Sequence, residues 1–366
     1  MRKKIHAQLP LMDTQVNHPR AREFEGISRI LDANPIICEM VLQDLTKGVN
    51  KCETGARGMT ADQVLRAAIV KQTEMISYKN LAFHIIDSRC YSRFCRIGFT
   101  HKGFKKSTLN TNIKAISAQT WEAINRVLAA YAEDKGIEKG RQARIDCTVT
   151  DSNIHKPTDS SLLWDGVRVL SRILSRAREN FEDLQFPFTD HRKRAKRRML
   201  GVMNAKNKKV RDKQYVDLLK VAHKTVCYVR GALPLLEQYP CRFVTQSLTA
   251  QGLAEWLAHY MELTLKVIDQ TERRVLYGET VPASEKTVSI FEPHTDIIIK
   301  DRREIFYGHK VCLSSGPSNF ITDCLILDGN PADTSLTLEM LDRQEQIYGR
   351  YPLKVALDGG FASKDN

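Results

Sequence analysis

Apolar residues in the first third of the chain recur at the spacing of helices. Three short runs follow the capping residues Thr60, Ser77 and Ser107, and a longer fourth run comes after them. Before these runs the pattern is weaker, with a polar stretch and then a short amphipathic segment. We therefore expect an N-terminal arm over residues 1–58 and a helical domain over residues 59–135.

The hydrophobic period changes in the middle of the chain. Residues 142–151 are β-branched and alternating, which predicts a strand with Asp146 inside it. A carboxylate in the middle of a buried strand is costly unless it binds a metal ion or a partner. Helical spacing then returns, and we assign residues 156–289 to a helical, basic insertion after this first strand.

Strand patterns reappear toward the C-terminal end of the sequence. They predict three strands, over residues 295–300, 305–313 and 319–327. A helix is expected after Asp333, and a short buried strand over residues 353–357. Without the insertion, this is the order of elements in the first part of an RNase H-like α/β fold. We assign residues 142–155 and 290–366 to such a core, which is incomplete.

The charge of the chain indicates a polyanionic partner. Its 366 residues carry a formal net charge of +13, and Lys and Arg release condensed counterions when they contact nucleic-acid phosphates. The sequence has no apolar run of about 18 residues, so we expect no membrane span. The nine cysteines have no C-x-x-C spacing, which is typical of free thiols in a reducing cytoplasm. We expect a cytoplasmic, nucleoid-associated protein.

Two clusters of basic residues are candidates for contact with DNA. One cluster flanks the third short helix. It is a candidate because three short helices with tight connections resemble a helix-turn-helix module, in which such a helix contacts DNA. An ordinary helical bundle fits the pattern equally well. The other cluster is the densest charge run of the chain, between His191 and Lys213. Its only acid is Asp212, so few i,i+4 ion pairs can neutralise it. The candidate contact residues are Lys105, Lys106, Asn110, Lys114, Arg192, Lys193, Arg194, Lys196, Arg197 and Arg198.

Asp146 and Asp358 are the candidate catalytic and metal-binding residues. In an RNase H-like fold the first and fourth strands are neighbours, so the two carboxylates would approach each other at one face of the sheet. Carboxylates so close repel unless a cation lies between them. Mg²⁺, or Mn²⁺ in its place, is the expected ion because it takes oxygen ligands. Asp328 competes for the second position, but it precedes the helix that the second acid should follow.

One segment of the sequence is more specific than the rest. It reads RIDCTVTDSNIHKPTDSSLL over residues 144–163 and continues with DGVR over residues 165–168. It resembles the first-Asp segment of bacterial insertion-sequence DDE transposases, most like the ISNCY group. Four further segments are similar to that family's later signatures or to its N-terminal DNA-binding domain: YGHK at 307–310, LDGGFAS at 357–363, QVLR at 63–66 and SYKNLA at 77–82.

This resemblance implies a catalytic Asp-Asp-Glu triad, bound Mg²⁺, and binding to the terminal inverted repeats of the element in double-stranded DNA. It carries the first acid onto Asp146 and the second onto Asp358. The Glu would lie on a later helix, which the sequence up to Asn366 does not contain, so we expect the chain to be inactive alone. Glu339 could offer a carboxylate instead, although an exposed helical Glu is the default interpretation.

Two other functions stay open at this point. The chain could be a non-catalytic DNA-binding transposase fragment, or an RNase H-like nuclease unrelated to transposition. The missing third acid distinguishes a non-catalytic fragment from an active transposase. The segment around Asp146 argues against a nuclease unrelated to transposition. A homo-oligomer is one option for the assembly, on which the sequence is silent.

Overall fold

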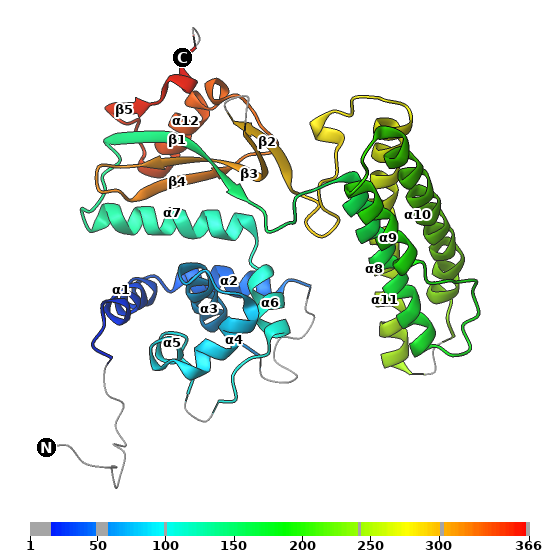
Figure 1. The fold of residues 1–366 in the computed structure, drawn as a ribbon. Helices are drawn as coiled ribbons and strands as arrows, with labels where there is room; N and C mark the ends of the chain where they lie inside the picture. The colour runs from blue at the N-terminus through cyan, green and yellow to red at the C-terminus, as the bar shows by residue number, and fades with distance from the viewer. Residues whose placement is uncertain (1–15, 49–57, 99–100, 241–242, 301–303, 364–366) are drawn as a thin grey trace, which may run out of the picture. The chain divides into compact units, whose positions relative to one another are not determined.

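The computed structural model describes residues 16–48, 58–98, 101–240, 243–300 and 304–363 (Figure 1). The chain divides into two compact units, and each collects segments that are distant in the sequence. The first unit contains Met1–Arg144, Ser314–Cys324 and Glu339–Ala356; the second contains Ile145–Leu313, Leu325–Leu338 and Leu357–Asn366.

Seven helices form the N-terminal part of the first unit. They are α1 (Pro19–Ala33), α2 (Ile36–Thr46), α3 (Ala61–Thr73), α4 (Tyr78–Asp87), α5 (Arg89–Phe94), α6 (Lys106–Lys114) and α7 (Ala118–Asp134). Phe24 of α1 lies in one apolar cluster with Leu81 of α4 and Leu109 of α6. Val41 of α2 lies in a second cluster with Leu65 of α3. Residues 1–58 were expected to be an arm, but α1 and α2 within that range are part of this helical core.

The caps that the sequence predicted are present at two of the three short helices. Thr60 and Gln63 form a reciprocal capping box at α3, and the side chain of Ser77 accepts from the backbone of Asn80 at α4. The third expectation is wrong in detail, because α6 begins at Lys106 and has no side-chain cap at its start. The short helix α5 between α4 and α6 was not predicted.

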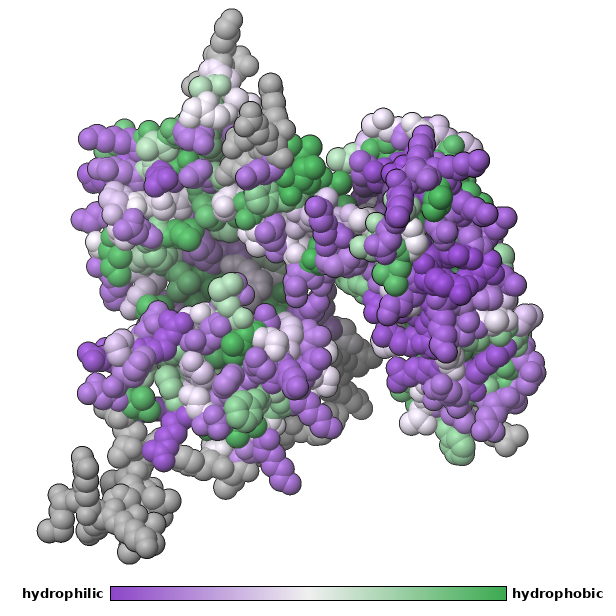
Figure 2. Space-filling model, viewed as in Figure 1, coloured by the Kyte–Doolittle hydropathy of each residue, from purple (hydrophilic) through white to green (hydrophobic). Residues whose placement is uncertain are grey.

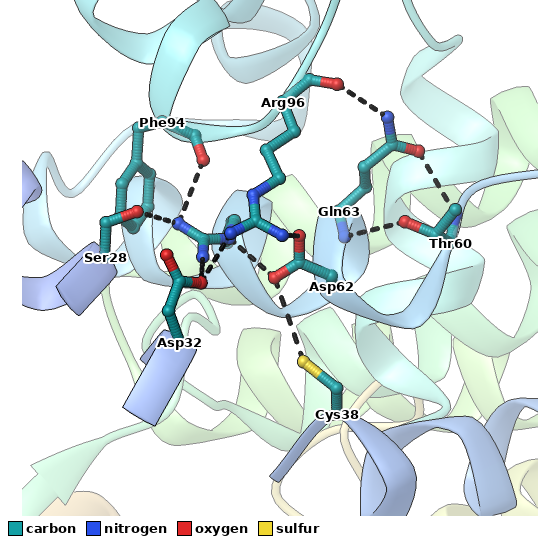
Figure 3. Close-up of polar contacts among 9 residues, drawn as sticks. Ser28, Asp32, Cys38, Thr60, Asp62, Gln63, Phe94 and Arg96 are labelled. Atoms are coloured by element: carbon teal, nitrogen blue, oxygen red, sulfur yellow. Dashed lines mark hydrogen bonds and ion pairs between the residues drawn. The ribbon is translucent and has the colours of Figure 1, made fainter. Parts of the chain in front are cut away.

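A fully buried arginine joins α1, α3 and α5 (Figure 3). Arg66 of α3 donates to Asp62 at 2.6 Å, to Asp32 of α1 at 2.8 Å, and to the carbonyl oxygen of Phe94 at 3.3 Å. It also donates to the hydroxyl of Ser28. A buried guanidinium is tolerated only when its donors are satisfied, and these partners come from three different helices.

Residues 159–271 form a four-helix bundle in the second unit (Figure 1). Its helices are α8 (Asp159–Asn180), α9 (Arg192–Met203), α10 (Lys208–Glu237) and α11 (Val244–Thr271). They share one apolar core, to which α8 contributes Leu163 and Leu170, α10 contributes Leu218, and α11 contributes Leu257. The prediction of a long helical segment after the first strand is confirmed. Among the described residues, no helix combines the length and apolar character that crossing a membrane requires.

A mixed five-stranded sheet completes the α/β fold. Its strands are β1 (Gln142–Asp151), β2 (Asp296–Lys300), β3 (Glu304–Ser315), β4 (Ile321–Ile326) and β5 (Lys354–Leu357), with helix α12 (Thr337–Tyr348) between β4 and β5. The strand order is β2-β3-β1-β5, and β4 also pairs with β3. β2 runs antiparallel to β3, from Asp296 opposite Gly308 to Lys300 opposite Glu304. All five predicted strands are present, but the expectation that the last one is buried is wrong, because every residue of β5 is exposed.

β3 approaches β1 closely at a glycine of the YGHK segment. A Cβ atom added to Gly308 would lie 1.9 Å from the carbonyl oxygen of Thr150, which is an impossible contact with backbone. Just beyond it, the backbone N–H of Ser152 donates to the carbonyl oxygen of Tyr307 at 2.9 Å. Glycine at this position therefore allows the two central strands to approach each other this closely.

Candidate active site and nucleic-acid interface

Asp146 lies on the exposed face of β1. Along this strand Ala143 and Ile145 are buried, whereas Arg144 and Asp146 are exposed. Successive side chains of a strand point to opposite faces, so Asp146 lies on the other face of β1 from Cys147. The expectation that its carboxylate is buried in the strand is wrong, because only one face of β1 is covered at that position.

Asp358 follows the last residue of β5 and is also exposed. The carboxylate of Asp358 accepts a hydrogen bond from the backbone N–H of Gly360 at 2.8 Å, which caps the short 3₁₀-helix η4 (Gly359–Phe361). This contact fixes one carboxylate oxygen and leaves the other available. Asp before Gly is common in turns and helix caps, and here Asp358 does act as a cap.

The strands that carry the two acids are neighbours. The backbone N–H of Leu353 donates to the carbonyl oxygen of Arg141 at 2.8 Å. Leu353 is five residues before Asp358, and Arg141 is five residues before Asp146. Because β5 pairs with β1 beyond this bond, both strands run in the same direction. The pairing therefore places Asp146, inside β1, beside the part of the chain where β5 ends and Asp358 follows.

A cavity of about 270 Å³ opens beside Asp358. Lys310 of β3 and Asp333 line it with Asp358, and the ammonium group of Lys310 lies 2.6 Å from the carboxylate of Asp333. Lys310 also donates to the carbonyl oxygen of Pro331 at 2.6 Å. Asp146 is not among the residues that line this cavity.

Asp333 is the residue of this site that the sequence did not identify. Its position suggested only a helix cap, and an Asp before a helix gives no other signal. The two alternatives considered for the acids are both exposed: Asp328 lies in the turn after β4, and Glu339 lies in the first turn of α12.

The described residues contain no group of three or more His, Cys, Asp or Glu side chains arranged to hold a metal ion. Exposed carboxylates such as those of Asp146 and Asp358 are nevertheless of the type that a hard cation binds. Mg²⁺ binds through one or two carboxylates and keeps several of its waters, and both Asp146 and Asp358 are open to water. The two carboxylates do not meet in this structure, however, because Asp358 lines the cavity that Cys147 also lines, whereas Asp146 lies on the other face of β1.

Cys147 lies next to Asp146 in sequence but has a different environment. A hydrogen bond with the thiol of Cys312, followed by burial and by the nearby Asp333, raises the pKa of Cys147 far above its ordinary value. Since the thiolate is the reactive form of cysteine, this shift lowers the reactivity of Cys147 at neutral pH.

We expect iodoacetamide to modify Cys227, which is exposed on α10, at least about tenfold faster than Cys147 at pH 8, because the thiolate fraction and access both favour it. Mass spectrometry of the alkylated peptides measures both rates. In denaturant Cys147 should react as fast as the other cysteines. Equal rates in the folded protein would mean that Cys147 is not held protonated in the sheet.

Half of the basic candidates on α9 are engaged in ion pairs within the bundle. Arg192 contacts Asp190 at 2.7 Å, and both Arg194 and Arg198 donate to Asp217 of α10. Hydrogen bonding by Arg194 is the main reason that the pKa of Asp217 is lowered. The expectation that the run has few neutralising partners is wrong for these three residues, because their acids lie outside the run.

The other three α9 candidates form a free basic row. Lys193, Lys196 and Arg197 are exposed, and none of them has an ion-pair partner within the part of the chain that the structure describes. The bundle presents a strongly hydrophilic surface (Figure 2). We call these three residues the α9 row.

The candidates on α6 differ from one another. Lys105, Lys106 and Lys114 are exposed at the two ends of this helix. Asn110 is half-buried, and its side-chain oxygen is shielded from solvent. The three lysines thus lie on the surface, whereas the Asn110 oxygen does not.

No protein-family model, curated protein or solved structure matches the chain.

Proposed function

We propose that the chain acts in DNA transposition as an insertion-sequence transposase, which binds the ends of its element and cuts and joins DNA strands when a third acid completes the pair Asp146 and Asp358. The observation that carries this proposal is the pairing of β1 with β5, because Asp146 lies inside β1 and Asp358 directly follows β5. β4 pairs with β3, β1 lies between β3 and β5, and α12 precedes β5, which is the arrangement expected of an RNase H-like core.

The proposal requires one carboxylate oxygen from each of Asp146 and Asp358 to reach a divalent ion, although Asp146 lies outside the cavity that Asp358 lines. When bound, such ions activate a water or a 3′-hydroxyl and stabilise the leaving oxygen of a phosphodiester. The backbone N–H of Gly360 orients the Asp358 carboxylate. Both acids are exposed, so a DNA backbone can approach them.

Two basic surfaces support binding to DNA in this proposal. The α9 row lies on the bundle, and the lysines of α6 lie on a helix of a module that resembles a helix-turn-helix. Contacts of this kind recognise phosphates and not sequence. We infer that the α9 row binds the duplex backbone and leaves readout of the element ends to other residues.

Replacing Lys193, Lys196 and Arg197 together by Gln is expected to weaken duplex binding about tenfold or more, for all sequences alike. The slope of log affinity against log salt should fall by about 2.7, because each phosphate contact contributes about 0.9. Titrations monitored by fluorescence anisotropy at several salt concentrations measure both quantities.

The matched control replaces Arg192, Arg194 and Arg198 by Gln, which removes the same formal charge. These guanidinium groups are already paired with Asp190 and Asp217, so we expect a clearly smaller change in the salt slope. Equal losses from both triple variants would show that the ion pairs do not set which residues contact DNA.

A further inference from the structure

A row of arginines follows one face of α8. Arg168, Arg172 and Arg176 are spaced four residues apart, so they lie on the same side of the helix. Arg168 contacts Asp165 at 2.6 Å. Arg172 and Arg176 are exposed, and neither has an acidic partner among the residues that the structure describes. Two unneutralised guanidinium groups therefore face solvent one turn apart.

An aromatic row on α11 faces these arginines. Trp256 and Tyr260 lie one turn apart, and α11 packs against α8. Trp256 is 54% exposed, and two other apolar residues of α11, Val244 and Leu248, are exposed as well. Together with Arg172 and Arg176, the two aromatic side chains line a cavity of about 210 Å³.

The aromatic row continues beyond the cavity. The ring of Phe291 lies 6.3 Å from that of Tyr260, and the Arg168 guanidinium lies 5.5 Å from the Phe291 ring. Arginine and aromatic side chains thus lie side by side along α8 and α11. We call the part lined by Arg172, Arg176, Trp256 and Tyr260 the α8–α11 groove.

This combination matches the two parts of a nucleotide. Guanidinium groups bind phosphates through paired hydrogen bonds, and exposed aromatic rings stack on the faces of bases. A duplex hides its base faces inside the stack, so only unpaired nucleotides can use Trp256 in this way. A purely acidic ligand would use the arginines and leave the indole unused.

We propose that the α8–α11 groove binds single-stranded DNA. Trp256 stacks on an unpaired base, with Tyr260 beside it, and Arg172 and Arg176 hold the flanking phosphates. The inference rests on the proposed function only for the choice of DNA. It adds a second DNA site on the bundle, with different residues and a different preference from the α9 row.

The test compares an oligothymidylate of roughly ten nucleotides with a duplex, both fluorescently labelled, on the whole chain at one salt concentration. Trp256→Ala should weaken oligothymidylate binding roughly 5- to 100-fold, the loss expected for one base–aromatic stack. Trp256→Phe should retain most of the affinity, because an aromatic face remains. Duplex affinity should be unaltered in both variants.

The arginines are tested by the double variant Arg172→Gln, Arg176→Gln. It should reduce the salt slope for the oligothymidylate by about 1.4, because each single-strand phosphate contact contributes about 0.7. The matched control is Arg230→Gln, which removes an exposed arginine of α10 and should change single-strand affinity by less than the groove variants. Thermal melts of each variant verify that the bundle stays folded.

The outcomes separate this inference from the proposed function. If Trp256→Ala binds the oligothymidylate as tightly as the unmodified chain, the groove does not stack bases and the inference is overturned, while duplex binding through the α9 row stands. If the chain does not bind duplex but its single-strand binding depends on Trp256, the proposed function fails and the groove stands. If the unmodified chain does not bind the oligothymidylate, the inference that the groove binds single-stranded DNA is overturned.

Discussion

Replacing Arg66 by Met is expected to lower the unfolding free energy of the N-terminal helices by about 3 kcal/mol. Methionine occupies a similar volume but removes the buried charge that neutralises Asp32 and Asp62. It also leaves the carbonyl oxygen of Phe94 without the donor that it has now. Breaking a buried ion pair costs about 3–5 kcal/mol. We expect the low end because Arg96 still contacts both carboxylates, at 2.5 and 3.2 Å.

Hydrogen exchange of the whole chain, followed by mass spectrometry, measures this effect locally. Peptides that cover α1 and α3 should lose protection, whereas peptides from the bundle should not change. The control is Arg96→Met, which removes a half-exposed arginine that contacts the same two acids. It should cost less than about 1 kcal/mol, as exposed ion pairs do. Equal protection in Arg66→Met and the unmodified chain would contradict the role given to the buried network.

Asp146→Asn and Asp358→Asn are each expected to abolish binding of Mn²⁺ to the sheet. Asparagine keeps the volume of aspartate but removes the negative charge that a divalent ion requires. Loss of even an outer-sphere partner costs about 10- to 100-fold in metal affinity, so loss of a direct ligand should exceed that. Electron paramagnetic resonance of free Mn²⁺ during a titration measures the affinity.

The control for the metal site is Asp328→Asn. Asp328 is exposed and also precedes a glycine, so it matches Asp358 in local sequence, but it follows β4 and not β5. We expect it to bind one Mn²⁺ as the unmodified chain does. If Asp328→Asn loses the ion and Asp358→Asn keeps it, the second acid has been assigned to the wrong strand.

Elements with local signals could be predicted from the sequence. Capping residues such as Thr60 and Ser77 mark helix starts by themselves, and alternation over β1 marks a strand. The adjacency of β1 and β5 followed from the order of elements, because few sheet topologies accommodate that order. These predictions depend on neighbours in sequence or on general rules of topology.

Features that depend on distant partners could not be predicted. Phe24 of α1 packs against Phe94, with ring centroids 4.6 Å apart, and nothing near Phe24 in the sequence announces that contact. Arg194 and Arg198 are neutralised by Asp217, which is 23 and 19 residues away, so a count of i,i+4 pairs misses it.

The proposed active site shows the same limit. The positions of Asp146 and Asp358 on neighbouring strands follow from topology, but the exposure of Asp146 does not, because burial of one face of β1 depends on what packs there. Asp333 enters the cavity beside Asp358 through its contact with Lys310 of β3. A strand residue and a cap residue that are 23 positions apart give no joint signal in the sequence.

The central claim is that Asp146 and Asp358 hold a divalent ion beside bound DNA. The direct measurement loads the chain with Fe²⁺, which takes similar ligands, on a labelled duplex that carries the repeats flanking its gene. Ascorbate and hydrogen peroxide then generate hydroxyl radicals at the ion, which cut nearby DNA. We predict one localised cut with the unmodified chain and none with Asp146→Asn or Asp358→Asn, at equal occupancy of the duplex. A localised cut that persists in both variants, or no localised cut on fully bound DNA, would contradict the account.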